Sequence, residues 1–520
     1  MDTKALRQKI LDLAIRGKLV PQDPNDEPAS VLLERIRAEK QQMVKEGKLK
    51  PKDIKNDTVI FKGDDNLHYE QFADGTVKCI EDEIPFELPD GWEWCRIRNI
   101  ASVKGGKRLP KGESFSDDVT DHVYIRVTDM KNRTINTFGL KYISEEVFAK
   151  IQSYTIGKND LYVTIAGTIG VVGEVPEILD GMNLTENAVK VCNISINKTF
   201  LCYVMLSELV QQQFQDKTHQ VAMPKLALER ILGTLIPVCP VKEQQLIVFS
   251  IKSALQIADT IEIQKDTLFE LVSATKSKIL DLAIRGKLVP QDPNDEPASV
   301  LLERIRAEKE ELIKQGKIKR DKKESVIFKG DDNSYYEKIG DEIICIDEEI
   351  PFDIPDNWGF SRLKSIWELL SGRDLAPNQY NDNKVGIPYI TGASNFVNGK
   401  VSLVRWTPEP QVITNCGDLL ITCKGTIGEM AINDFGRAHI ARQIMAIKNI
   451  YNLNANYLSL CLQFYIESIK LAAKGLIPGI SREDILNIIL PIPPEEYQVK
   501  VVKVVHRYKE ILNSIEASLN

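Results

Sequence analysis

Two groups of basic residues are the strongest candidates for chemistry in this sequence. The first group places four positive charges in eight residues around two glycines and three more in YIRVTDMKNRT; its members are Lys104, Lys107, Arg108, Lys111, Arg126, Lys131 and Arg133. The second group is more dispersed, and its members are Arg373, Lys424, Arg437, His439, Arg442 and Lys474. Because such side chains contact phosphate oxygens, we predict that both groups are edges of a nucleic-acid-binding surface. The alternative is that each residue is a solvated loop charge.

Side-chain amides near these groups could contact base edges. Arginine suits guanine and asparagine or glutamine suits adenine, because each can make two hydrogen bonds to the base in the major groove. The candidates of this type are Asn132, Asn136, Asn395, Asn398 and Gln443.

Catalytic motifs are missing from the sequence. There is no G-x-x-x-x-G-K-[ST] phosphate loop, no G-x-G-x-x-G after a strand and no H-E-x-x-H among the five histidines. The amino-methyltransferase signature, Asn or Asp before Pro-Pro and an aromatic residue, is also missing, and the nine cysteines form no C-x-x-C pair. GTIG at 167–170 and 425–428 indicates a tight structural turn rather than a phosphate-binding loop. We therefore predict no catalytic residue and no metal site.

Length, charge and composition limit the class of protein. A chain of 520 residues with 43% hydrophobic residues predicts two to four globular domains. The net charge of −7 argues against bulk electrostatic coating of nucleic acid but allows local basic patches. No segment approaches the roughly 18 to 20 apolar residues of a membrane span, and the N-terminus resembles an amphipathic helix rather than a signal peptide. We expect a cytoplasmic protein.

The chain contains a long internal duplication. KILDLAIRGKLVPQDPNDEPASVLLERIRAEK occurs at 9–40 and again, letter for letter, at 278–309. The match continues more weakly, since TVIFKGDDNLHYE is answered by SVIFKGDDNSYYE and EIPFELPDGWEW by EIPFDIPDNWGF. Two long copies predict two similar units with pseudo-two-fold symmetry rather than a short-period solenoid.

The duplication predicts a mixed α/β (α+β) fold with two similar globular domains, separated by two long helices that form an antiparallel coiled coil. The divergent globular domains are expected at 86–240 and 352–493. The duplicated helical and linker regions are expected at 1–85 and 291–351, the central helix at 241–290 and the C-terminal helix at 494–520.

Heptad-like spacing defines the two long helices. The seam positions are Ile247, Ile251, Ala254, Ala258, Ile261 and Leu268 in the central helix and Val501, Val505, Tyr508, Leu512 and Ile515 in the C-terminal helix. We expect Ile247, Ile251, Ile261 and Leu268 to pack against the C-terminal helix. The register is circular, so the N- and C-terminal helices together are expected to rebuild a copy of the central element, with the chain ends close together.

Local signals predict where the duplicated helices end. Gly17 and Gly286 favour a stop, and Pro21 and Pro290 cannot continue a helix. Asn25 or Asp26 is then predicted to cap the next helix of the first copy.

This pattern resembles the specificity subunit of Type I restriction-modification systems over essentially the whole chain. The resemblance rests on the duplicated LDLAIRGKLVPQDPNDEPASVLLERIRAEK blocks, the paired NDLYVTIAGTIG and GDLLITCKGTIG segments, and the endings IPVCPVKEQQ and LPIPPEEYQ that lead into the helices. It implies that each divergent domain is a target recognition domain that binds one half of a split, asymmetric sequence in double-stranded DNA.

The resemblance also implies a division of labour among subunits. The helices would set the spacer between the half-sites and dock two modification (methyltransferase) subunits. S-adenosylmethionine, ATP and magnesium would be bound by the modification and restriction (ATPase-nuclease) subunits, and no cofactor by this chain. Two alternatives remain: a coiled-coil scaffold with two ligand-binding heads that do not bind DNA, and a nuclease or methyltransferase in its own right.

Overall fold

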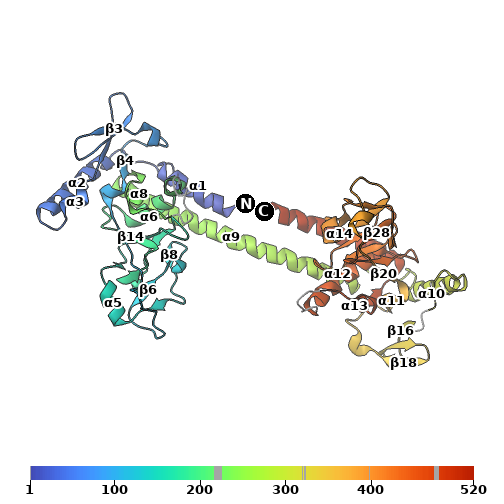
Figure 1. Ribbon diagram of the computed structural model, residues 1–520. Helices are drawn as coiled ribbons and strands as arrows, with labels where there is room; N and C mark the ends of the chain where they lie inside the picture. The colour runs from blue at the N-terminus through green and yellow to red at the C-terminus, as the bar shows by residue number, and fades with distance from the viewer. Residues whose placement is uncertain are drawn as a thin grey trace. The chain divides into compact units, whose positions relative to one another are not determined.

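The computed structural model describes residues 2–215, 225–318, 320, 324–397, 399–472 and 479–519. The chain divides into two compact units, unit 1 (Met1–Gln264) and unit 2 (Lys265–Asn520). Figure 1 labels their elements. One helix of 44 residues, α9 (Val241–Ile284), contributes its first part to unit 1 and its second part to unit 2.

Within its described residues, unit 1 combines helices with five small sheets. Its other helices are α1 (Thr3–Ile15), α2 (Ala29–Lys45), α3 (Pro51–Ile54), α4 (Ile97–Ile100), α5 (Glu145–Ile151), α6 (Lys198–Leu206), α7 (Glu208–Gln215) and α8 (Leu228–Leu232). A three-stranded sheet has the strand order β1 (Val59–Lys62), β2 (His68–Gln71), β3 (Val77–Cys79). Two four-stranded sheets have the orders β10 (Thr155–Ile156), β13 (Met182–Leu184), β6 (Val123–Ile125), β9 (Lys141–Tyr142) and β12 (Val172–Glu174), β11 (Leu161–Thr164), β14 (Ala188–Cys192), β5 (Ser102–Gly105). Two strand pairs complete the set: β15 (Leu235–Val238) with β4 (Glu93–Arg96), and β7 (Met130–Lys131) with β8 (Thr134–Ile135).

Unit 2 repeats this topology sheet by sheet. Its helices are α10 (Ala298–Lys314), α11 (Leu363–Ile366), α12 (Ala455–Ala472), α13 (Arg482–Leu486) and α14 (Glu495–Leu519). Its three-stranded sheet has the strand order β16 (Ser325–Lys329), β17 (Tyr335–Ile339), β18 (Glu342–Cys345). Its four-stranded sheets have the orders β25 (Ile413–Thr414), β28 (Ala438–Ile440), β21 (Ile387–Ile390), β24 (Trp406–Thr407) and β27 (Met430–Ile432), β26 (Leu419–Thr422), β29 (Ile444–Lys448), β20 (Glu368–Ser371). The strand pairs are β30 (Ile489–Ile492) with β19 (Gly359–Arg362), and β22 (Phe396–Val397) with β23 (Lys400–Val401). The predicted mixed fold with two similar units is confirmed.

The middle strand of each head is buried on both faces. We call residues 93–238 head 1 and residues 359–492 head 2. In β11, Leu161 and Val163 join the core beneath the helices, whereas Tyr162 joins the core on the opposite face of the sheet. In β26, Leu419 and Leu420 divide in the same way. A continuous apolar run is what a strand covered on both faces requires.

The GTIG segments are structural turns, as the sequence predicts. Each connects two antiparallel strands, β11 to β12 and β26 to β27. The amide of Gly170 donates to the carbonyl of Thr164, and the amide of Gly428 to that of Thr422, both over 2.9 Å. Both glycines have a φ of 85°, which an L side chain rarely adopts.

The helix stops at Gly17 and Gly286 are also confirmed. Their φ angles are 63° and 69°, and a Cβ on Gly17 would lie 2.5 Å from the ring of Pro89. The predicted cap at Asn25 or Asp26 is wrong. Helix α2 begins at Ala29 because its amide donates to the carbonyl of Gly91 (2.8 Å), a tertiary contact that replaces a side-chain cap.

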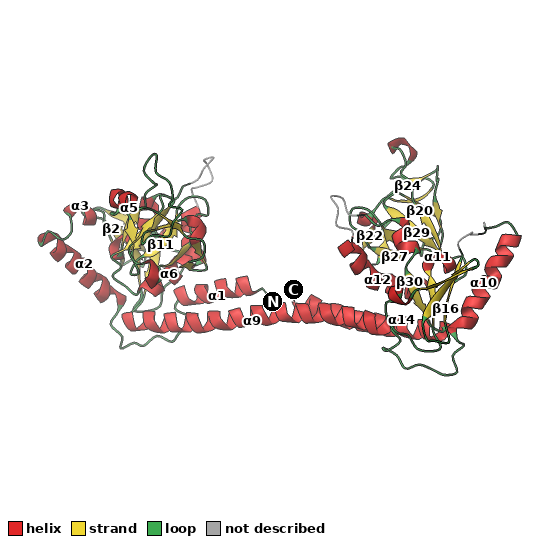
Figure 2. Ribbon diagram, turned by 90° about the horizontal axis from the view of Figure 1, so that it is seen from below, coloured by secondary structure: helices red, strands yellow, loops and turns green. Residues whose placement is uncertain are grey.

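An antiparallel helix pair supports each head. In unit 1, α1 runs beside the first part of α9 (Figure 2). The two helices are antiparallel, since Arg7 near the start of α1 contacts Glu262, whereas Gln22, beyond the end of α1, contacts Glu243 near the start of α9. In unit 2, the last part of α9 pairs with α14, and Lys276 Nζ lies 2.7 Å from Glu516 Oε2. Ile247 and Ile251 share a core with α1, and Val501 and Val505 share one with the end of α9.

The structure corrects the predicted packing of Ile247 and Ile251 and the predicted burial of Leu268 and Tyr508. Ile247 and Ile251 pack in unit 1 with α1 and head 1, not with the C-terminal helix. Leu268 and Tyr508 are 38% and 45% exposed and therefore lie off the buried seam. Ala258 is buried, and Ala254, Ile261, Leu512 and Ile515 are partly buried. The expected proximity of the chain ends stays a prediction.

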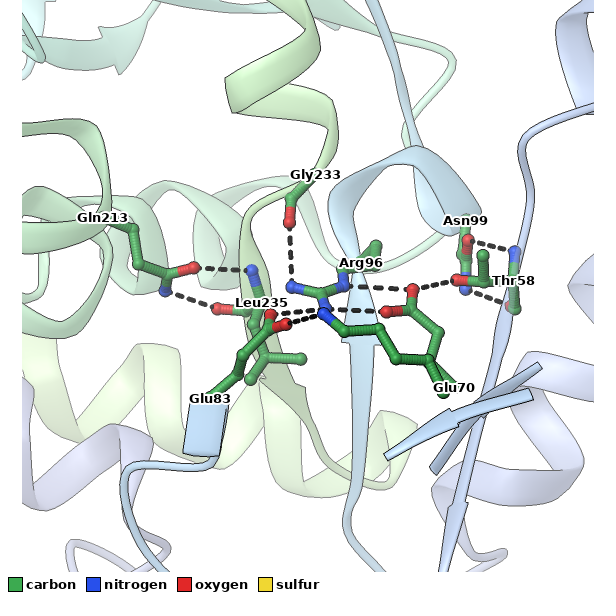
Figure 3. Close-up of polar contacts among 9 residues, drawn as sticks. Thr58, Glu70, Glu83, Arg96, Asn99, Gln213, Gly233 and Leu235 are labelled. Atoms are coloured by element: carbon green, nitrogen blue, oxygen red, sulfur yellow. Dashed lines mark hydrogen bonds and ion pairs between the residues drawn. The ribbon is translucent and has the colours of Figure 1, made fainter. Parts of the chain in front are cut away.

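A buried arginine joins each three-stranded sheet to its head, and Figure 3 shows the one in unit 1. The guanidinium of Arg96 lies 2.7 Å from carboxylate oxygens of both Glu70 and Glu83, and it donates to the carbonyl of Gly233 (3.1 Å). Glu70 also accepts from the hydroxyl of Thr58 (2.7 Å). Burial opposes ionisation of Glu70, but its hydrogen bonds with Arg96 hold its pKa below the usual range.

Unit 2 contains the same network. Arg362 lies 2.7 Å from both Glu337 and Glu349 and donates to the carbonyl of Asn487 (2.9 Å). We did not predict either network from the sequence, although its members occupy matching positions in the repeat.

None of the helices in the described ranges combines the length and the apolar character of a membrane span.

Candidate nucleic-acid interface

In unit 1 the first basic residues lie on the loop that follows β5, beside the turn between β13 and β14. Gly106 allows the close approach, because a Cβ there would lie 2.1 Å from the carbonyl oxygen of Thr185. Arg108 Nε lies 2.6 Å from Glu186 Oε1, and the Arg108 side chain is 79% exposed. Lys107 is exposed as well, so this loop presents two positive charges to solvent.

The equivalent loop of unit 2 follows β20, beside the turn between β28 and β29. A Cβ on Gly372 would lie 2.1 Å from the carbonyl oxygen of Ala441. Arg373 is exposed, and Arg442 Nε lies 2.8 Å from Asp374 Oδ2. The loop and the turn therefore approach each other in the same way in both heads.

The ion pair across this approach has opposite polarity in the two heads. Arg108 on the loop of head 1 faces Glu186 on the turn, whereas Asp374 on the loop of head 2 faces Arg442 on the turn. Burial alone would raise the pKa of Glu186, but the hydrogen bond from Arg108 keeps it below the usual range. The two heads thus present different charge patterns on one backbone framework.

A buried tyrosine fixes each basic loop. The hydroxyl of Tyr124 donates to the carbonyl of Lys107 (2.7 Å), and burial raises the pKa of Tyr124 to about 12, which keeps it a proton donor. In unit 2 the amide of Leu375 donates to the hydroxyl of Tyr389 (3.3 Å). These hydrogen bonds hold part of each loop's backbone against its head.

Two predicted residues of unit 1 have partners within the head. Arg126 Nη2 lies 2.7 Å from Asp129 Oδ1, and Arg133 Nη1 donates to the hydroxyl of Tyr203 (2.8 Å). The Arg126 side chain therefore holds its own turn, and the Arg133 side chain joins the turn between β7 and β8 to α6. The exposed remainder of the predicted group consists of Lys104, Lys111 and Lys131.

The predicted basic residues of unit 2 are more scattered. Lys424 follows β26, and its backbone pairs with that of Gly479. Arg437 precedes β28, and both side chains are exposed. Lys474 and Asn398 lie outside the described residues.

Two predicted contacts are wrong because their side chains are buried. His439 is fully buried, and its ring nitrogens lie 2.9 Å and 2.8 Å from the carbonyl oxygens of Val412 and Arg373. Asn395 is 1% exposed, and its amide bonds to Ser402 and its own turn. The exposed amides among the candidates are Asn132, Asn136 and Gln443.

Lys225 was not predicted but lies at the same turn of head 1. Its Nζ is 3.4 Å from the carbonyl oxygen of Glu186, close to Arg108. The sequence signal was weak, because Lys225 is 114 residues beyond Lys111 and only the fold brings them into one head.

Among the described residues, no group of three or more His, Cys, Asp or Glu side chains could hold a metal ion.

Comparisons with known proteins identify the family. The model of the Type I restriction modification DNA specificity domain matches residues 89–271 and 355–520. The chain is 27% identical to the type I restriction enzyme EcoEI specificity subunit and 28% identical to the EcoAI specificity subunit, both from Escherichia coli, over 99% of this chain and 90% of each relative. The fold is similar to a chain in a solved structure of the type I R-M system (TM-score 0.52, 17% identity), over 84% of this chain and 94% of that one. The chain therefore belongs to the family of type I restriction-modification specificity subunits.

Proposed function

We propose that head 1 and head 2 each bind one half of a bipartite, asymmetric DNA target. The proposal is supported by the loops at 105–111 and 371–376, which lie at equivalent places and carry exposed basic residues. Lysines and arginines of this kind position a protein on phosphates, while other side chains contact the bases. The predicted phosphate contacts of both heads belong to this proposal.

The reversed ion pair is the observation that carries the two-target proposal. An arginine donates to guanine, whereas a carboxylate accepts from the amino group of cytosine. Head 1 presents arginine on the loop and carboxylate on the turn, and head 2 presents the reverse. Two heads with one framework and different polar groups are suited to two different half-sites.

The helix pairs supply the second part of the proposal. They set the number of base pairs between the half-sites, and two methyltransferase subunits dock on this chain, one for each copy of the repeat. S-adenosylmethionine, ATP and magnesium belong to the methyltransferase and restriction subunits. This chain acts in the cytoplasm and contributes target choice rather than a catalytic residue.

Methylome sequencing of the source cells, with and without this gene, tests the proposal. We expect deletion to remove adenine methylation from one split, asymmetric motif and from no other. The methylated motif found in the undeleted strain then gives the sequence of both half-sites and the number of base pairs between them. If purified chain and its methyltransferase partner fail to bind or methylate DNA carrying any split motif, the heads are ligand-binding modules of a scaffold instead.

A further inference from the structure

Each three-stranded sheet carries an outward row of three side chains. In unit 1, Phe61 pairs with Tyr69 in the strand register, and Tyr69 pairs with Cys79. His68 and Glu70, which alternate with Tyr69, are buried toward the head. Since successive side chains in a strand point to opposite faces, the row from Phe61 to Cys79 points outward.

Unit 2 repeats this row residue for residue. Phe328 pairs with Tyr336, and Tyr336 with Cys345. The aromatic rings stack with centroids 5.9 Å apart in both sheets. Phe61 and Phe328 are 40% and 39% exposed, and both cysteines are exposed.

Folding does not require these outward residues to be identical in the two copies. The loop between the second and third strands differs in length between the two sheets. Residues 72–76 join β2 to β3, whereas only residues 340–341 join β17 to β18. Substitutions at exposed positions usually change stability by less than about 0.5 kcal/mol. The unchanged row therefore indicates a shared contact of the two sheets.

The segments that carry these sheets hold the excess negative charge of the chain. Residues 57–90 contain ten acidic and two basic residues, and residues 324–356 contain eleven acidic and two basic residues. From totals of 74 acidic and 67 basic residues, the rest of the chain keeps 53 and 63, a net charge of +10. These sheets repel phosphate, whereas the remainder of the chain attracts it.

Two carboxylates of unit 1, Asp64 and Asp65, lie beside the outward row, whereas Glu70 and Glu83 are paired with Arg96. A shallow hollow on this face is lined by Phe61, Tyr69, Val77, Asp64 and Asp65. An apolar floor with carboxylates at its rim suits a protein surface that offers lysine or arginine beside apolar side chains.

We infer that the outward faces of β1–β2–β3 and β16–β17–β18 are a duplicated docking surface for one basic protein partner, bound once to each unit. The inference rests on the proposed function, under which this partner is the methyltransferase subunit. The buried networks of Arg96 and Arg362 hold the sheets on the heads, so the surfaces are preformed.

Thiol labelling of the full chain tests this surface without any substitution. Cys79 and Cys345 lie in the two rows, and Cys416, which is exposed in head 2, is the internal control. We expect the methyltransferase subunit to slow maleimide labelling of Cys79 and Cys345 by more than about tenfold and to leave Cys416 unchanged. Peptide mass spectrometry measures all three rates in one sample.

A variant pair provides the second readout. We expect F61S together with F328S to weaken methyltransferase binding by more than about tenfold and to leave DNA binding and melting unchanged. The matched control is F138S with V385S, since these side chains are 89% and 57% exposed but lie in the heads. We expect the control chain to bind two methyltransferase subunits, as the wild type does.

The outcomes separate the docking surface from the proposed function. If the wild-type chain binds methyltransferase while Cys79 and Cys345 keep their free rates, the surface is wrong and the proposed function stands. If the folded wild-type chain binds no methyltransferase, the proposed function fails and the inference fails with it. Protection that appears in the chain alone as its concentration rises would assign the surface to a second copy and overturn the inference.

Discussion

The ion pair that joins the two helices of unit 1 has a counterpart in unit 2. Arg7 Nη2 lies 2.6 Å from Glu262 Oε2, and Lys276 Nζ lies 2.7 Å from Glu516 Oε2 at the equivalent place. Together with the Arg96 and Arg362 networks, this pair shows that polar contacts of the framework are kept in both units. The framework therefore presents the same surfaces twice.

The interiors of the two helix pairs differ at single positions. Glu243 at the start of α9 accepts from Trp92 Nε1 (2.9 Å), and the equivalent residue of α14 is Tyr497. Leu255 is buried in unit 1, and its equivalent is Lys509, whose pKa is lowered by burial and by Lys276. One fold thus tolerates a carboxylate or a phenol, and an alkyl chain or an amine, at the same place.

The largest expected effect comes from breaking one buried network. Because R96M would leave Glu70 and Glu83 without their cation in a buried site, we expect unit 1 to lose about 3–5 kcal/mol of stability. R362M should destabilise unit 2 to a similar extent. Urea unfolding followed by hydrogen exchange in 59–79 and 325–345 distinguishes the units.

The control for both variants is R437M, because Arg437 is exposed. Unchanged unfolding of R96M would mean that the buried carboxylates do not need the arginine. A loss in both units from one variant would contradict the independence of the two networks.

The helix seam of unit 1 gives the next largest effect. Ile251 is 1% exposed, so we expect I251A to cost about 2–5 kcal/mol through lost burial and a cavity. The matched variant I257A, at a side chain that is 61% exposed on the same helix, should change stability by less than about 0.5 kcal/mol. Equal melting temperatures for the two variants would place Ile251 outside the core.

The pH dependence of unit 1 should contain a contribution that unit 2 lacks. Burial raises the pKa of Glu243 although Gln22 and Trp92 donate to it. A carboxyl group that binds its proton more tightly in the folded state stabilises that state less as the pH rises above its usual pKa of 4.5. At the same place Tyr497 carries no charge in this range.

We therefore expect the stability of unit 1 to fall more steeply with rising pH in the wild type than in E243Q. Thermal unfolding from pH 4 to pH 7, resolved by hydrogen exchange in 241–255, measures the difference. Parallel curves for the two proteins would show that Glu243 titrates normally.

The smallest effect on stability is expected from reversing the ion pair of head 1. R108D with E186R would give head 1 the polarity of head 2, and since the Arg108 side chain is 79% exposed, the loss of the pair should cost less than about 1 kcal/mol of stability. We expect the first half of the methylated motif to alter and the second half to persist. Methylome sequencing with an unaltered motif would remove this pair from target choice.

The sequence predicted what depends on local chemistry and repetition. The two units, the stops at Gly17 and Gly286 and the GTIG turns follow from the duplication and from backbone preferences, and the structure confirms them. The duplicated blocks also carried the family resemblance that the comparisons show.

Burial and partners could not be predicted, because they depend on residues far apart in the chain. His439 and Asn395 have polar side chains typical of binding sites, yet neighbouring strands and turns enclose both. Tyr508 fits the heptad spacing but is 45% exposed. Arg96 gave no signal of its own, since Glu70, Glu83 and Gly233 meet it only in the folded unit.

A domain exchange tests the independence of the two heads most directly. Residues 86–240 are replaced by the first recognition domain of another family member, and the methylome of cells that carry the hybrid is sequenced. We expect one half of the methylated motif to change and the other half, together with the spacer, to remain. A change in both halves, or in neither, would contradict the assignment of one half-site to each head.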